Sequence, residues 1–182
     1  MSKFEIPKKN WKSIPVKSAE FILNESKDYV DYTLKASEKV TNRSYSMILI
    51  LIGILSAIGG YTFDDMVTKE LTQITYLNIF FIITIVCLIT YLSFNVFPNK
   101  IMVKGRIPKE LARKEFLVIP NMTPEENYLM YVIQEIENVQ HKIDYNQIQN
   151  MKLGNKMKIV MYAMVLLLPI YLISVFFVVN LS

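Results

Sequence analysis

Three long stretches of the 182-residue sequence lack any aspartate, glutamate, lysine or arginine. They cover residues 44–63, 71–99 and 159–182. About 20 apolar residues in a helix cross the hydrocarbon core of a bilayer, which is about 30 Å thick. One charged side chain at its centre costs roughly 2.5–3.5 kcal/mol on insertion scales. The absence of charge therefore favours transmembrane helices at 44–63, 71–97 and 159–180 over buried helices of a soluble protein.

The sequence is also poor in residues that bind metals or form covalent intermediates. Cys87 is the single cysteine, which excludes a disulfide framework within the chain. His141 is the single histidine, and although Glu137 and Asp144 lie near it on a predicted helix, one histidine makes a poor metal site. The uncharged stretches offer no acid or base, and no glycine-rich phosphate loop or G-x-S-x-G motif is present. We therefore expect no enzyme activity, no metal and no cofactor.

The charges that are present divide unevenly between the flanking segments. Residues 1–43 hold nine basic and six acidic side chains, and residues 100–158 hold ten and seven. Residues 64–70 hold one basic and three acidic side chains. An excess of lysine and arginine marks the cytoplasmic side of a membrane. We therefore expect residues 1–43 and 98–158 in the cytoplasm, and the 64–70 loop and the C-terminus outside.

The first charged segment has the periodicity of an amphipathic helix over residues 18–43. Its less polar residues recur at steps of three and four, and nothing breaks the pattern before the first uncharged stretch. The helix is therefore expected to continue into the first span as one rod. The face expected to be buried consists of Ile22, Ser26, Tyr29, Thr33, Ala36 and Val40.

A second amphipathic helix is expected at 124–153. Thr123, Pro124 and Glu126 give a helix start with a capping box, and Gly154 with Asn155 is expected to end the helix. Its apolar stripe must pack on the 18–43 helix, either of the same chain or of another subunit. The stripe consists of Leu129, Val132, Ile136, Val139 and Ile143. The expected fold is an all-α membrane protein with three transmembrane helices and a cytosolic helical bundle formed by these two helices.

The first span contains small residues four positions apart. Gly53 precedes Ala57, and Ser56 precedes Gly60. Small residues at this spacing let helices approach closely in lipid. We expect them to form a packing seam, either with the second span or with a neighbouring subunit.

The second and third spans contain the other candidate residues. Thr84, Cys87, Tyr91 and Asn95 fall on one face of the second span. This face is either a water-lined stripe of a pore or, more commonly, a set of helix–helix hydrogen bonds. Pro169 removes a backbone hydrogen bond near the middle of the third span and favours a kink, which is either structural or a gate.

A basic cluster follows the second span. Its candidate ligand-binding residues are Lys104, Arg106, Lys109, Arg113 and Lys114. Topology and attraction to anionic lipids, about 1 kcal/mol per residue, account for the cluster by themselves. The alternative is a site for an anionic ligand such as a nucleotide or short oligonucleotide, because basic side chains on irregular backbone can converge on phosphates.

The layout resembles small helical membrane effectors of bacterial antiphage defence, the SLATT class and related nucleotide-responsive pore proteins. The resemblance rests on the helix SAEFILNESKDYVDYTLKASEKV, the hairpin SYSMILILIGILSAIGGYTFDDMVTKELTQITYLNIFFIITIVCLITYLSF and the returning helix TPEENYLMYVIQEIENVQHKI. It implies an oligomeric pore in the bacterial inner membrane that depolarises the cell when a cytosolic signal or partner changes. The third span departs from the two-span SLATT pattern, and the resemblance assigns no functional residue.

Two functions are consistent with these features. We expect a homo-oligomeric, ion-conducting effector in the lipid bilayer, gated by a cytosolic anionic ligand or a partner protein. The alternative is a non-conducting adaptor that recruits or restrains a cytosolic partner through the 124–150 helix.

Overall fold

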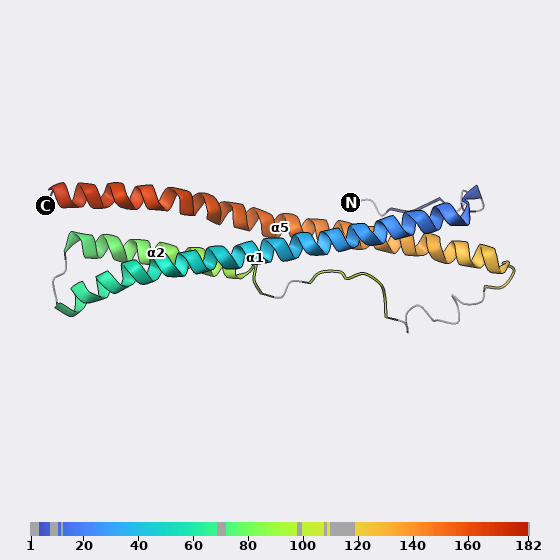
Figure 1. Ribbon diagram of the computed structural model, residues 1–182, viewed down its shortest axis with the longest axis horizontal. Helices are drawn as coiled ribbons and strands as arrows, with labels where there is room; N and C mark the ends of the chain where they lie inside the picture. The colour runs from blue at the N-terminus through green and yellow to red at the C-terminus, as the bar shows by residue number, and fades with distance from the viewer. Residues whose placement is uncertain are drawn as a thin grey trace. The chain divides into compact units, whose positions relative to one another are not determined.

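The computed structural model describes residues 4–7, 11, 13–68, 72–97, 100–107, 109 and 119–181. Its long elements are the helices α1 (Val16–Thr68), α2 (Gln73–Ser93) and α5 (Pro124–Leu181) (Figure 1). The part of the chain described here contains no strand, which confirms the expected all-α class. Each of the three helices contains a stretch long and apolar enough to cross a membrane.

The chain divides into two compact units. Unit 1 comprises residues 1–37 and 100–150, and unit 2 comprises residues 38–99 and 151–182. The division falls within α1 and within α5, so each of these helices supplies residues to both units. As expected, the N-terminal amphipathic segment and the first uncharged stretch belong to one continuous helix, α1, of 53 residues.

The core of unit 1 joins the start of α5 to the start of α1. It contains Ala19, Leu23 and Val30 of α1 together with Leu129, Val132, Ile133, Ile136, Val139 and Ile143 of α5. The predicted apolar stripe of the second amphipathic helix is thus buried against α1 of the same chain. The predicted capping box is also present: the Thr123 N–H donates to Glu126 Oε2 at 3.1 Å, and the Glu126 N–H donates to Thr123 Oγ1 at 3.2 Å.

The buried face of α1 differs from the prediction. Ile22 and Tyr29 remain 46% and 45% exposed, whereas their neighbours Leu23 and Val30 lie in the core. The core-facing line is therefore rotated from the predicted one by less than one residue step of about 100°. Thr33 is buried as predicted, and its hydroxyl donates to the Val30 carbonyl at 2.7 Å, so it enters the core with a hydrogen-bond partner.

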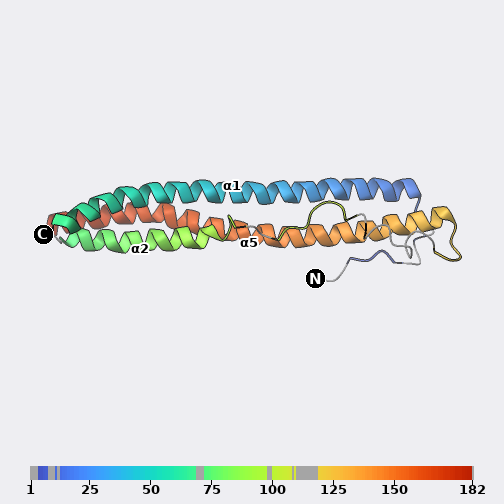
Figure 2. The ribbon, with the colours of Figure 1, turned by 90° about the horizontal axis from the view of Figure 1, so that it is seen from below.

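Unit 2 packs α2 against the second half of α1 and the second half of α5 (Figure 2). Its core is apolar and takes side chains from all three helices. These are Leu51 of α1, Phe81, Ile85 and Leu92 of α2, and Val160 and Leu167 of α5. The side chain of Thr72 caps the start of α2 by accepting from the Thr75 N–H at 3.4 Å.

Helix α5 does not end at the predicted position. It continues through Gly154, Asn155 and Pro169 without interruption. A glycine inside a helix costs about 1 kcal/mol, and burial of Val160 one to two turns later offsets that cost. Gly154 also lacks the left-handed backbone of a helix end, which among the described glycines only Gly105 adopts, with φ 83°.

Candidate functional site

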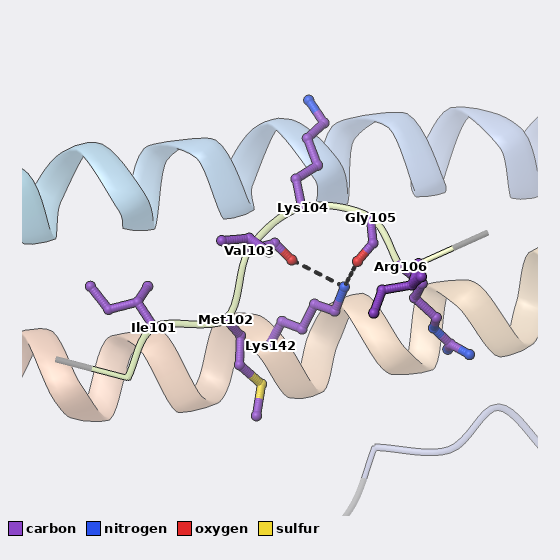
Figure 3. A pocket seen from close by; sticks show the side chains of 8 residues that line it. Ile101, Met102, Val103, Lys104, Gly105, Arg106 and Lys142 are labelled. Carbon is purple, nitrogen blue, oxygen red and sulfur yellow. Dashed lines mark hydrogen bonds between the residues drawn. The ribbon is translucent and has the colours of Figure 1, made fainter. Parts of the chain in front are cut away.

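Part of the predicted basic cluster forms an extended segment on the surface of unit 1. Residues 100–107, here called the strap, pass along α1 and α5 (Figure 3). Most of the strap, together with Lys142 of α5, lines a surface hollow of about 600 Å³. Gly105 turns the strap with a positive φ of 83°, a conformation that costs glycine little.

Two polar residues of α5 hold the backbone of the strap. The Oδ1 atom of Asn146 accepts from the Met102 N–H at 2.9 Å, and its Nδ2 atom donates to the Met102 carbonyl at 2.9 Å. The same Nδ2 atom donates to Thr33 Oγ1 of α1 at 3.1 Å. Lys142 donates to the Val103 carbonyl at 3.1 Å and also to the Gly105 carbonyl. The strap is thus tied to α5 through its backbone.

Lys104 extends from the strap toward α1. Its ammonium donates to Asp31 at 2.6 Å and lies 3.5 Å from the carboxylate of Asp28. The hydrogen bond with Asp31 is the largest cause that raises the pKa of Lys104 above the ordinary 10.5. The lysine therefore stays charged and paired at neutral pH.

Arg106 extends the other way, toward α5. Its Nη2 atom lies 3.1 Å from Oε2 of Glu135, a carboxylate on the buried side of α5. A buried carboxylate requires a charged or hydrogen-bonding partner. This pair consequently fixes the far end of the strap.

The structure does not bring the predicted ligand-binding residues together. Lys104 and Arg106 point in different directions (Figure 3), and each is paired with an acidic side chain. Lys109 is exposed. Arg113 and Lys114 lie outside the described residues. An anion that binds Lys104 must therefore compete with Asp31.

Sequence reasoning missed the acidic and amide partners of the strap. Asp31 lies on α1, 73 residues before Lys104 along the chain. Asp28 lies one helical turn before Asp31. A visible signal existed only for Asn146, where the apolar stripe of α5 is interrupted by a polar residue that the structure buries.

Asn95 is the member of the predicted polar stripe that links helices. It is buried, just after α2, and its Nδ2 atom donates to Ser44 Oγ of α1 at 3.2 Å and to the Leu153 carbonyl of α5 at 2.9 Å. The backbone carbonyl of Asn95 accepts from the Thr41 hydroxyl at 3.4 Å. One amide thus connects all three helices of unit 2.

The other members of that stripe lie on the outer side of α2. The Thr84 hydroxyl donates to the Phe80 carbonyl of its own helix at 3.0 Å. Cys87 is exposed, and Tyr91 is 39% exposed. Pro169 is exposed on α5. Within one chain, these residues face away from the core of unit 2.

The small residues of α1 also face outward. Gly53, Ser56, Ala57 and Gly60 are exposed. A Cβ atom added at Gly53 or Gly60 would meet no atom within 4 Å. The expected seam with the second span is therefore absent from the described part of unit 2, and the alternative seam, with a neighbouring subunit, stays a prediction.

A second polar link in unit 2 was not foreseen. The Tyr171 hydroxyl donates to Asn78 Oδ1 at 2.9 Å, and Asn78 is buried. The ring of Tyr171 packs edge-to-face on Phe81, with centroids 4.9 Å apart. This link joins α5 to the first half of α2, whereas Asn95 joins the helices at the other end of α2.

Searches against family models, curated proteins and solved structures find no match. Within the described residues, no group of three or more His, Cys, Asp or Glu side chains is arranged to hold a metal ion. His141 is exposed on α5.

Proposed function

We propose that the protein is an oligomeric membrane effector that conducts ions or depolarises the bacterial inner membrane, with unit 1 on the cytoplasmic side. The three helices that are long and apolar enough to cross a membrane supply the spans. The resemblance to small helical effectors suggests a role in antiphage defence.

The observation that carries the proposal is the open small-residue face of α1. Gly53, Ala57 and Gly60 are exposed, and open space surrounds both glycines. Small residues let helices approach closely in lipid, so this face suits a second copy of the chain. Because an apolar cluster packs between the three helices of unit 2, and the buried amides of Asn78 and Asn95 link helices, ions would pass between copies and not through one copy. Thr84, whose hydroxyl is bonded only within α2, is the candidate to line that path.

The charges of unit 2 support the proposed orientation. Lys39, Arg43 and the lysines of residues 152–158 lie in the part of the unit where Asn95 joins the three helices. Asp64 and Asp65 lie at the other end of the spans, near the start of α2. Basic residues mark the cytoplasmic side, so the Asn95 end of unit 2 faces the cytoplasm in this proposal.

The strap is the proposed place of gating. An anionic ligand such as a nucleotide or oligonucleotide would compete with Asp31 for Lys104, or with Glu135 for Arg106. Displacement of either carboxylate would release one side of the strap from a helix that continues into unit 2. A partner protein with an acidic segment would act in the same way.

The test is ion flux through liposomes that contain the purified full-length chain. We expect the chain to dissipate an imposed potassium gradient and to have an oligomeric mass in detergent. Gly53→Leu should abolish the flux and lower the mass. Gly154→Leu is the matched control, because this glycine also has open space around it but lies off the small-residue face. A chain that remains monomeric and leaves the gradient intact contradicts the proposal.

An adaptor is the second candidate, and one observation favours it. The start of α1 presents an exposed apolar and aromatic face in unit 1. Its residues are Phe21, Ile22, Tyr29 and Tyr32. A cytosolic partner could cover this face. An adaptor would give no flux in liposomes, and Phe21→Ser with Tyr32→Ser would remove its effect in cells; a pore would keep its flux in that variant.

A further inference from the structure

Aromatic side chains at the end of α2 contact a lysine of α5. The Nζ atom of Lys156 lies 5.4 Å from the ring centroid of Phe94 and 5.9 Å from that of Tyr91. The ring of Phe97 meets Phe94 edge-to-face, with centroids 6.4 Å apart. These three rings, here called the aromatic shelf, remain 39–62% exposed. Cation–π contacts hold the ammonium in place, while the exposed rings leave a surface for an apolar ligand.

The surroundings of the aromatic shelf are positively charged. Lys152 precedes Lys156 by four residues, which puts both side chains on one side of α5, and Lys152 is exposed. In the described part of unit 2 the acidic residues are Glu38 and residues 64–65. Asp65 accepts from the Thr75 hydroxyl near the start of α2, at the opposite end of that helix from the shelf. Glu38 lies toward the shelf's end of unit 2, as its neighbour Thr41 contacts Asn95, but the basic residues of that part outnumber it: Lys39, Arg43, Lys152, Lys156 and Lys158.

An apolar track continues from the shelf along the two helices. Helix periodicity places Ile83 and Phe80 on the same side of α2 as Tyr91, and Ile159 and Leu166 on the same side of α5 as Lys156. All four apolar side chains are more than half exposed. A ligand that is anionic at one end and apolar along its length matches this arrangement.

We propose that Lys156, Lys152 and the Tyr91 hydroxyl bind the phosphate of an anionic phospholipid, whose acyl chain lies on the aromatic shelf and the apolar track. This inference rests on the membrane insertion and orientation proposed above, which put this end of unit 2 at the anionic cytoplasmic leaflet. It goes beyond a general attraction of lysines to that leaflet. The ring contacts hold the Lys156 ammonium over the rings of Phe94 and Tyr91, so a phosphate accepts charge-assisted hydrogen bonds from a cation at a defined position.

The test measures which lipid stays bound to the full-length chain after detergent extraction. The chain is reconstituted in vesicles of equal phosphatidylcholine and phosphatidylglycerol, extracted, and examined by native mass spectrometry. We expect phosphatidylglycerol to be retained in preference, and Lys156→Gln to lower that preference roughly five-fold. Lys158→Gln is the matched control: it removes the same charge two residues away, about 200° around the helix, and should change the preference less than two-fold.

A second variant separates the site from charge alone. Tyr91→Leu keeps every charge but removes the ring face and the hydroxyl group, and it should also lower the preference. Equal effects of Lys156→Gln and Lys158→Gln, or no effect of Tyr91→Leu, would overturn the site. If soluble glycerol phosphate displaces the lipid, the site recognises a free phosphate group and not a phospholipid. If the unmodified chain retains the lipid but gives no ion flux, the proposed pore is contradicted and the lipid site is not. If alkaline washing releases the chain from membranes, both proposals are contradicted.

Discussion

The side-chain amide of Asn146 pairs with the backbone of Met102 through two hydrogen bonds of 2.9 Å each, so one residue of α5 fixes the register of the strap. Asn146→Ala leaves these two backbone groups without their partner and removes one of the two hydrogen bonds of the Thr33 hydroxyl. We expect unfolding of unit 1 to become easier by roughly 2–3 kcal/mol, and limited proteolysis to cut the strap faster. Gln147→Ala removes only an exposed hydrogen bond to the Tyr29 hydroxyl and no contact with the strap, so it should leave the cleavage rate of the strap unchanged. An unchanged cleavage rate in Asn146→Ala would contradict the role given to this amide.

The ion pair between Arg106 and Glu135 predicts a non-additive pair of variants. Arg106→Met leaves the carboxylate of Glu135 without its cation on the buried side of α5, which should cost about 3 kcal/mol. Arg106→Met combined with Glu135→Leu removes both charges and should recover most of that loss. Denaturant titration of the single and double variants measures the coupling. Additive losses would show that the pair is unimportant.

The partners of Lys104 predict a shift in its titration. The hydrogen bond from Lys104 to Asp31 raises the pKa of the lysine above 10.5, so the stabilisation it gives is present at neutral pH and is lost as the pH rises through that raised pKa. Asp31→Asn should return the pKa of Lys104 toward the ordinary value, with a smaller change for Asp28→Asn. NMR of the labelled lysine ammonium follows both. Because the pair is exposed, added salt should weaken it.

Asn95 and Thr84 predict opposite phenotypes although both belong to the polar stripe of α2. Asn95→Leu removes the hydrogen bonds to Ser44 and to the Leu153 carbonyl. It should lower the stability of unit 2 in detergent by about 1 kcal/mol. Thr84→Val removes only a hydroxyl bonded within its own helix, so stability should be unchanged while ion flux falls. Thermal unfolding in detergent and liposome flux, measured on both variants, separate packing from conduction.

The features predicted correctly are those with a local signal. The capping box at Thr123 and Glu126 is recognisable from four consecutive residues, and the apolar stripe from Leu129 to Ile143 repeats at helical spacing. The uncharged stretches likewise predicted the apolar helices, because charge exclusion is a property of each segment alone. These signals need no knowledge of the partner that a segment packs against.

The features that were missed depend on that partner. Leu23 and not Ile22 faces the core because α5 decides which side of α1 is covered. Gly154 does not end α5, because packing outweighs a weak local preference for a helix end. The pairing of Lys104 with Asp31 joins residues 73 positions apart. Such pairs can be read from a fold but not from spacing in one sequence.

The amide of Asn95 also has a consequence for the order of assembly. Its first partner, Ser44, has already been synthesised when α2 is complete, but Leu153 follows 58 residues later. If the chain inserts into the bilayer during translation, one N–H of the Asn95 amide therefore lacks its acceptor until α5 has been synthesised. Such a hydrogen is costly in hydrocarbon, so the end of α2 should stay in the hydrated headgroup layer until the last helix arrives and completes the three-helix assembly.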